Sequence, residues 1–185
     1  MKPAVQEALE TAALILGSAF LFAIFFKFNA WLFSDLIYRD GISWVFLPAG
    51  FRVILVLVLG LPGALGIVLG HFYLDRDLIQ SSLSLVVVNG LVSGLTPFVM
   101  MKLLGKGMRS GVLLQSLNPQ RLLQFTLVFA GATAFMHQLS WTLMRRDNVN
   151  MWVDVWPMFI GDALGALLML YCFKFVFSCF RPKAF

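Results

Sequence analysis

Two charged side chains of this sequence stand deep inside stretches that are otherwise apolar. Arg52 lies eight residues after Trp44, and Asp162 lies six residues after Trp156. At the centre of a bilayer an ionisable group costs ~2.5–3.5 kcal/mol, so such residues are rare and are candidates for function. A buried charge needs a partner or solvent. Because no other acidic residue lies as deep in an apolar stretch, we expect Arg52 and Asp162 to pair.

Other polar side chains fall into the same half of their apolar segments. Asn89 lies near the middle of one segment, and His137 lies in another. Trp44, Pro48 and Arg52 recur every four residues and therefore share one face of a helix. These polar side chains therefore gather in one half of the bundle and are absent from the other. This uneven distribution predicts a polar cavity that opens to one side and is rimmed by tryptophans. The predicted ligand-binding or buried polar cluster consists of Arg52, Asn89, His137, Asp162, Trp44 and Trp156.

Each of these groups also has a purely structural interpretation. Arg52 and Asp162 could serve only to join two helices. His71 could lie in interfacial water, and His137 could be a packed core histidine. Histidines on two helices could also ligate a haem or a metal, but we predict neither a metal nor a cofactor.

Sequence motifs of enzymes do not occur. The chain has no H-E-x-x-H, no G-x-S-x-G and no glycine-rich phosphate loop. With a single acid at depth, a mechanism that uses two carboxylates has no material. A proton relay through Asp162 and His137 stays open as an alternative, but nothing in the sequence makes it specific. We therefore predict that the protein is not an enzyme.

The elements that must position these residues are apolar helices. Of 185 residues 60% are hydrophobic and 12% charged, where soluble domains have about 25% charged residues, and the mean hydropathy is +0.87. A spanning helix needs ~20 apolar residues. The sequence predicts an all-α integral membrane protein, a single transmembrane domain over 1–185 built as a bundle of about six helices. The expected segments are 9–26, 42–61, 64–74, 78–104, 120–144 and 155–177, with turns at 61–63 and 75–77.

The distribution of basic residues predicts the orientation of the bundle. The loop between the fourth and fifth segments carries basic residues and no acidic ones, while the other loops carry both. The positive-inside rule then places both termini in the cytoplasm. The net charge of +5 is explained in this way and does not indicate nucleic acid. Alternatively, the basic loop could dock anionic membrane lipid or a cytoplasmic partner. Its basic residues, with those near it, are Lys102, Lys106, Arg109 and Arg121.

Small residues indicate which helices touch. Three segments carry two glycines four residues apart, a spacing that lets helix backbones approach closely in lipid. We expect the third, fourth and sixth segments to form a compact core through these glycines. The pairs are Gly66 and Gly70, Gly90 and Gly94, and Gly161 and Gly165.

Four short strings occur in a recognisable order. They are Leu47-Pro48-Ala49-Gly50, Leu61-Pro62-Gly63-Ala64-Leu65-Gly66 with Gly70-His71, Val88-Asn89-Gly90-Leu91, and Trp156 followed by Gly161-Asp162-Ala163-Leu164-Gly165. Over roughly residues 41–175 the chain resembles the first class of membrane-associated sensor (MASE) domains. The positions that carry over are Pro48, Gly50, Asn89, Trp156, Gly161, Asp162 and Gly165.

The resemblance implies a sensory or ligand-binding role on the outer side of a bacterial inner (cytoplasmic) membrane. Members usually have about eight spans and a cytoplasmic signalling domain, such as a cyclic-nucleotide synthase, a phosphodiesterase or a histidine kinase. Here the sixth segment is followed only by a short basic tail. We therefore expect signal transduction to pass through separate membrane or cytoplasmic signalling proteins.

Two alternative functions stay open. A short chain without catalytic residues also suits an accessory or structural subunit of a larger membrane protein complex. The length, the six spans and an outward pocket are also similar to substrate-binding components of energy-coupling-factor vitamin transporters. The Ala-x-x-x-Ala spacing that such components need occurs at Ala4, Ala8 and Ala12.

Overall fold

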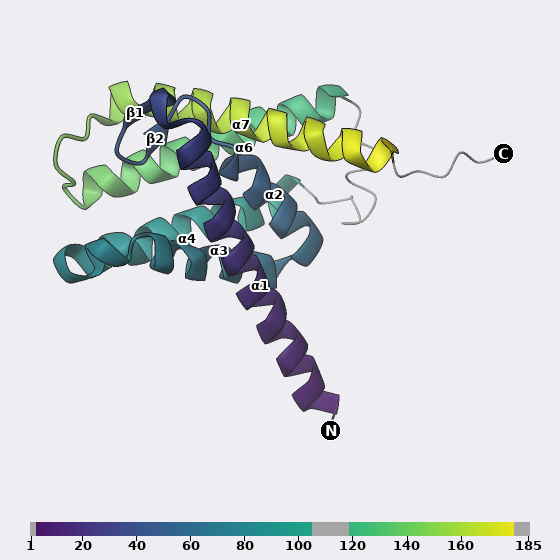
Figure 1. Cartoon of the computed structure of the whole chain (residues 1–185). Helices are drawn as coiled ribbons and strands as arrows, with labels where there is room; N and C mark the ends of the chain where they lie inside the picture. The colour runs from purple at the N-terminus through teal and green to yellow at the C-terminus, as the bar shows by residue number, and fades with distance from the viewer. Residues whose placement is uncertain (1–2, 105–118, 180–185) are drawn as a thin grey trace.

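The computed structural model describes residues 3–104 and 119–179, and within these ranges the chain forms six α-helices and one short β-hairpin (Figure 1). The predicted all-helical architecture is confirmed to this extent. Lys106 and Arg109 of the predicted basic loop, and Arg181 and Lys183 near the C-terminus, lie outside the described residues. The helices are α1 (Pro3–Leu32), α2 (Pro48–Leu59), α3 (Leu61–Leu74), α4 (Ile79–Leu104), α6 (Pro119–Leu143) and α7 (Met151–Cys179).

Three of these helices are long and apolar enough to cross a membrane. The candidate spans are Ala4–Leu32 in α1, Arg76–Leu103, which begins three residues before α4, and Met151–Phe173 in α7. The helices α2 and α3 have 12 and 14 residues. They are therefore about 18 and 21 Å long, shorter than the ~30 Å hydrocarbon core of a bilayer. The helices α2 and α3 are therefore too short for the six full spans that we expected.

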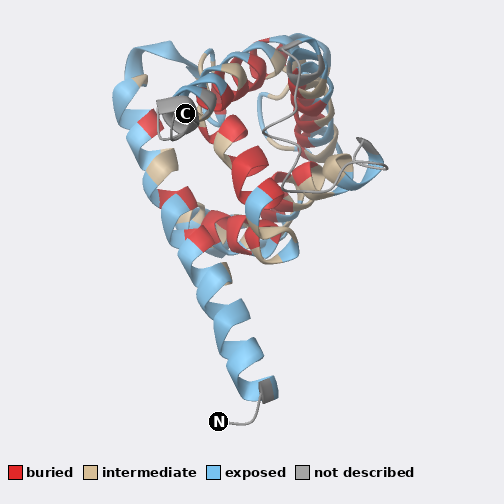
Figure 2. Ribbon diagram, turned by 90° about the vertical axis from the view of Figure 1, so that its right-hand side faces the viewer, coloured by how far each residue is buried: buried red, intermediate tan, exposed pale blue. Residues whose placement is uncertain are grey.

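The helix α1 is much longer than the expected segment 9–26. Its C-terminal half packs along α3, where the Cβ-free faces of Gly66 and Gly70 lie against Ser18, Ala19 and Phe22. Its N-terminal half projects away from the other helices, and every side chain from residue 4 to residue 14 is exposed (Figure 2). One half of α1 therefore belongs to the bundle and the other half does not.

The prediction of a helix from residue 42 is wrong for its first six residues. Here the chain forms a hairpin of β1 (Ile37–Arg39) and β2 (Ile42–Ser43), which turns at Gly41 with φ +86°. The helix α2 begins only at Pro48, because proline fits the first helical turn, where its missing N–H is not needed. The connection from residue 44 to 47 is irregular as a result.

The helices α2 and α3 follow each other almost without a break. The turn between them is Gly60, with φ +64°, and Pro62 lies in the first turn of α3. The structure therefore places this tight turn at residue 60, one residue before the predicted 61–63. Positive φ favours glycine, whereas proline after it starts a new helix.

The last two helices form an antiparallel pair around a short loop. The helix α7 begins at Met151, four residues before the expected start, so Asp154 lies in its first turn and not in the loop. The Asp154 carboxylate accepts a hydrogen bond from the backbone N–H of Asn150 at 2.8 Å, as acids near a helix N-terminus often do. The loop itself contains Arg145 and Asn148 with positive φ.

The glycine pairs do not form the core that we predicted. Gly90 and Gly94 of α4 contact α3, as expected, but the glycine pair of α3 contacts α1. Gly161 and Gly165 of α7 lie under the irregular connection before α2: a Cβ at either position would be 1.9 Å from the carbonyl oxygen of Ser43 or Phe46. In this chain close approach therefore joins a helix to an irregular segment as well as helix to helix.

Candidate functional site

A cavity of about 310 Å³ lies at the end of the bundle where the hairpin, residues 75–78 and the α6–α7 loop meet. This volume is at the small end of the range for ligand pockets, ~300–1,000 Å³. Its mouth carries Asp40, which is exposed, and Arg146, which is half-buried, while its deep end holds Arg52 and Asp162. The polar residues that line it are Asp40, Ser43, Arg52, His71, Asp75, Asn89, Ser93, His137, Arg146 and Asp162.

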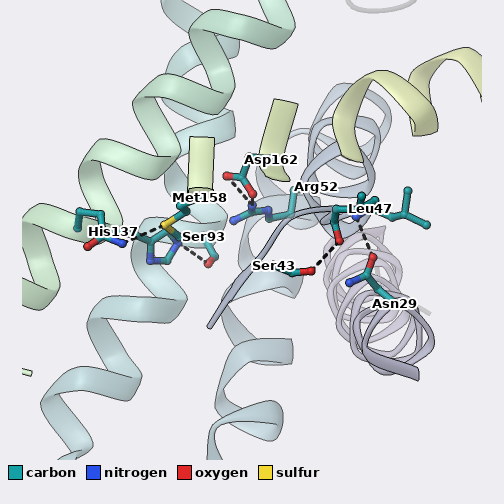
Figure 3. A network of polar contacts seen from close by, with 10 residues as sticks. Asn29, Ser43, Leu47, Arg52, Ser93, His137, Met158 and Asp162 are labelled. Atoms are coloured by element: carbon teal, nitrogen blue, oxygen red, sulfur yellow. Dashed lines mark hydrogen bonds and ion pairs between the residues drawn. The ribbon is translucent and has the colours of Figure 1, made fainter. Parts of the chain in front are cut away.

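The predicted ion pair is present at the deep end. Nη2 of Arg52 lies 3.5 Å from both carboxylate oxygens of Asp162, and each residue is 2% exposed (Figure 3). The pair joins α2 to α7. The two helices can come this close because Gly50 of α2 has no side chain. A Cβ at this position would clash with Ala166 and Met169 of α7.

Much of the hydrogen-bonding capacity of Arg52 is unused. Its hydrogen bonds to Asp162 run through Nη2 alone, and Nε has no hydrogen-bond partner among the described residues. The guanidinium also lies over the rings of Phe46 and Phe129, at 5.4 and 6.0 Å from their centroids. A guanidinium has five N–H donors in a planar fork that suits a carboxylate or a phosphate. At the deep end of the cavity this fork is only partly occupied.

The connection between β2 and α2 holds Arg52 in position from below. The backbone N–H of Phe46 donates to the carbonyl oxygen of Gly161 at 3.1 Å. The backbone N–H of Leu47 donates to Oδ1 of Asn29 at 3.0 Å (Figure 3). These bonds satisfy the irregular backbone and fix the start of α2 between α1 and α7.

A second polar group at this end comes from α4 and α6. Nε2 of His137 is hydrogen-bonded to Oγ of Ser93 at 3.1 Å, and both residues are buried. Nδ1 of His137 has no partner among the described residues. In Figure 3 the His137 and Ser93 side chains lie beside the Arg52 guanidinium. The histidine can therefore donate or accept one further hydrogen bond.

Asn89 belongs to a third group, nearer to the mouth. Its Oδ1 accepts a hydrogen bond from the indole N–H of Trp141 at 2.8 Å, and its Nδ2 donates to Asp75 at 3.2 Å. His71 lies 3.8 Å from the same carboxylate. Burial raises the pKa of Asp75, but the contacts with His71, Asn89 and Arg146 together outweigh it and lower that pKa below its ordinary value of 3.8.

The mouth is built from the hairpin and the α6–α7 loop. The guanidinium of Arg146 stacks on the Trp141 ring at 4.3 Å and donates to the carbonyl oxygen of Asp40 at 3.2 Å. The next residue, Gly41, lies against the same ring, and a Cβ there would be 3.0 Å from it. Arg39 forms an ion pair with Asp154 that ties the hairpin to the start of α7.

Two predicted site residues lie elsewhere. Trp44 is 39% exposed and packs edge-on against Tyr38, and Trp156 is 64% exposed; neither lines the cavity. The placement of these two tryptophans in the buried cluster was therefore wrong. Tryptophan has an apolar body and one polar N–H, so its position at a bundle surface is common in membrane proteins.

Most lining residues were missing from the predicted cluster, among them Trp141, Asp75 and Ser93. Trp141 follows His137 by one helical turn, and Asp75 follows His71 by one turn. These spacings were a usable signal, because residues four apart share a helix face. Ser93 carried no such signal, since serine is common in apolar helices.

The described residues contain no group of three or more His, Cys, Asp or Glu side chains that could hold a metal ion. Scans of the chain against family models, curated proteins and solved structures found no match. The resemblance to membrane-associated sensor domains therefore stays a prediction. What the site can do chemically follows from its own atoms: it can hold a small molecule through buried donors.

Proposed function

We propose that this chain is a non-enzymatic, multi-pass protein of a bacterial inner membrane that binds a small polar ligand and acts through protein partners. The role is that of a membrane sensor domain. The observation that supports it best is a cavity whose wall contains buried polar atoms without partners among the described residues, namely Arg52 Nε and His137 Nδ1. A buried polar atom without a hydrogen-bond partner destabilises the protein, and a bound ligand could supply that partner.

A panel of small water-soluble compounds tests ligand binding directly. We expect at least one compound to raise the unfolding temperature of the purified protein in detergent. A Ser93→Leu variant fills the cavity, so the same compound should leave its unfolding temperature unchanged. Ser81→Leu, an exposed position on the same helix, is the matched control and should respond like the wild type. An equal response of all three proteins would contradict a site in this cavity.

The proposed orientation puts both termini in the cytoplasm and the cavity mouth on the outer side. It agrees with the mixed charge of the hairpin and loops that surround the mouth. Single cysteines at Asp77 and Asp147, introduced after Cys172 and Cys179 are replaced by serine, should react with an impermeant maleimide added to intact spheroplasts. Reaction only after lysis would reverse the orientation.

A second candidate function is that of a subunit in a larger membrane complex. It is favoured by α1, whose residues 4–14 are exposed and project from the bundle (Figure 2). Purification from the native membrane in a mild detergent, followed by mass spectrometry, separates the two functions. A stoichiometric set of larger membrane proteins, lost in a Leu9→Trp and Leu16→Trp variant, would favour the subunit. Recovery of the chain alone would favour the sensor.

A further inference from the structure

We propose that the cavity takes a small organic monocarboxylate, with its carboxylate on Arg52 at the deep end and an uncharged body toward the mouth. This inference rests on the proposed ligand-binding function and names the class of ligand. Three features carry it: the partly occupied guanidinium, the donors beside it, and the negative charge at the mouth.

The deep end provides a fork for a second carboxylate. Asp162 uses only Nη2 of Arg52, at 3.5 Å to each oxygen, which is long for a charge-assisted hydrogen bond. Such bonds are normally ~2.7–2.9 Å. Arg52 is buried among Phe46 and Phe129, where an unfilled donor is costly. A ligand carboxylate would occupy the free N–H groups in the geometry that guanidinium prefers.

The neighbours of Arg52 suit the same group. His137 and Ser93 form a hydrogen-bonded pair beside the guanidinium, and His137 retains a free Nδ1. In the tautomer in which the Ser93 hydroxyl donates to Nε2, the Nδ1–H of His137 is free to donate to a ligand oxygen. A bound carboxylate would share the Arg52 cation with Asp162, and the two negative charges would repel each other. The charge of Asp162 therefore limits the affinity for the ligand, and its removal should raise that affinity.

The mouth selects against a second anionic group on the ligand. Asp40 and Asp75 both line it, and Arg146, the cation that the described residues place there, is already stacked on Trp141 and bonded to the Asp40 carbonyl. The wall between the two ends is largely apolar, with Phe26, Phe46, Leu78 and Met158. An apolar or aromatic body fits this wall, while a distal carboxylate would meet like charge.

Fluorine NMR with fluorobenzoate and fluorobenzamide tests the proposal on the full chain in detergent. The two probes share size and shape and differ in charge. We expect fluorobenzoate to bind at least about tenfold more tightly than the amide, and a fluorinated terephthalate to bind about tenfold more weakly than fluorobenzoate. Equal binding of benzoate and benzamide would overturn the anionic class while leaving a ligand-binding cavity in place.

Asp162→Asn provides the sharper test because it should raise the affinity for the ligand, whereas the loss of a merely structural contact would lower it. Without the competing carboxylate, Arg52 should bind fluorobenzoate about tenfold more tightly. Fluorobenzoate should also restore much of the thermal stability that the variant loses. Arg52→Lys keeps the charge but loses the fork and should bind several-fold more weakly.

Asp154→Asn is the matched control. Asp154 is a buried, ion-paired aspartate on the same helix, but it does not line the cavity. Its removal loosens the hairpin at the mouth and should lower stability, but it should not produce the tighter binding of fluorobenzoate that is expected of Asp162→Asn. Weaker binding to Asp162→Asn than to the wild type, or equally tightened binding to Asp154→Asn, would overturn the proposal. No rescue of Asp162→Asn by saturating fluorobenzoate would do so as well.

Discussion

Arg52 and Asp162 meet through a single guanidinium nitrogen, Nη2, which lies 3.5 Å from both carboxylate oxygens in a setting where each residue is 2% exposed. A pair built for stability alone would use two parallel hydrogen bonds, as arginine and carboxylate commonly do. This pair neutralises both charges but leaves Nε of Arg52 without a hydrogen-bond partner among the described residues. That geometry agrees with a site that holds a ligand beside a permanent counter-ion.

Breaking the pair from one side should be costly. Asp162→Asn leaves a buried guanidinium without its counter-ion, and Arg52→Gln leaves a buried carboxylate. Each should lose about 3–5 kcal/mol of stability. The double variant should lose less than the sum of the two single losses, because neither charge is then left alone. Unfolding curves of the four purified proteins in detergent measure this difference.

Additive losses in that cycle would contradict an energetic coupling between the two residues. Thr142→Ala combined with Asp162→Asn offers the comparison, since Thr142 is exposed and is not a cavity residue. Its effect should simply add to that of Asp162→Asn.

The glycines of α7 give a prediction that does not depend on function. A Cβ at Gly161 would lie 1.9 Å from the carbonyl oxygen of Ser43, at the end of β2, and one at Gly165 would lie 1.9 Å from that of Phe46, in the connection before α2. Neither oxygen belongs to a flexible side chain, so the connection must shift and carry the start of α2 with it. Gly161→Ala or Gly165→Ala should therefore destabilise the protein by about 1–3 kcal/mol or more.

Gly131→Ala in α6 is the internal control for this effect. Its Cβ would meet only Phe159, at 3.8 Å, an ordinary contact. Alanine also favours a helix over glycine by about 0.5–1 kcal/mol. Thermal unfolding should then rank Gly131→Ala at or above the wild type and both α7 variants below it. The opposite order would mean that α7 does not press on the connection.

Residue types predicted the deep charges well. Arg52 and Asp162 are the residues that an apolar helix tolerates least, so their pairing could be predicted from depth alone. The hairpin could not be predicted in this way. Residues 42–47 are apolar enough for a helix, but the pairing of β1 with β2 and the long-range bonds of Phe46 to Gly161 and of Leu47 to Asn29 favour the irregular path. Local hydropathy contains no information about such partners.

The sequence also does not distinguish the buried tryptophan from the exposed ones. Trp44, Trp141 and Trp156 are equivalent in the sequence as aromatic residues near segment ends, yet Trp141 alone among them is buried in the cavity wall. The difference lies in Asn89, which accepts the Trp141 N–H, and in Gly41, which leaves room for the ring. Both partners are more than 45 residues away, beyond the reach of a helix-face argument.

Trp141→Phe should test that hydrogen bond. The substitution keeps an aromatic ring but leaves Oδ1 of buried Asn89 without its donor, which costs about 1–3 kcal/mol. Trp156→Phe, at an exposed position with 64% of the residue accessible, should change stability by less than ~0.5 kcal/mol. Chemical unfolding of both variants in the same detergent gives the comparison. Equal losses would argue against a special role for Trp141 in the wall.

The charge of Asp75 should make part of the stability depend on pH. Its pKa is lowered in the folded protein, since the contacts with His71, Asn89 and Arg146 outweigh the effect of burial. A lowered pKa means that the folded state favours the ionised form, so the contribution is complete above the ordinary value of 3.8 and is lost as pH falls through the lower folded value. As the pH falls below 3.8, the difference in unfolding free energy between wild type and Asp75→Asn should therefore shrink. A difference that grows as the pH falls would mean that Asp75 is protonated more readily in the folded protein than in the unfolded chain.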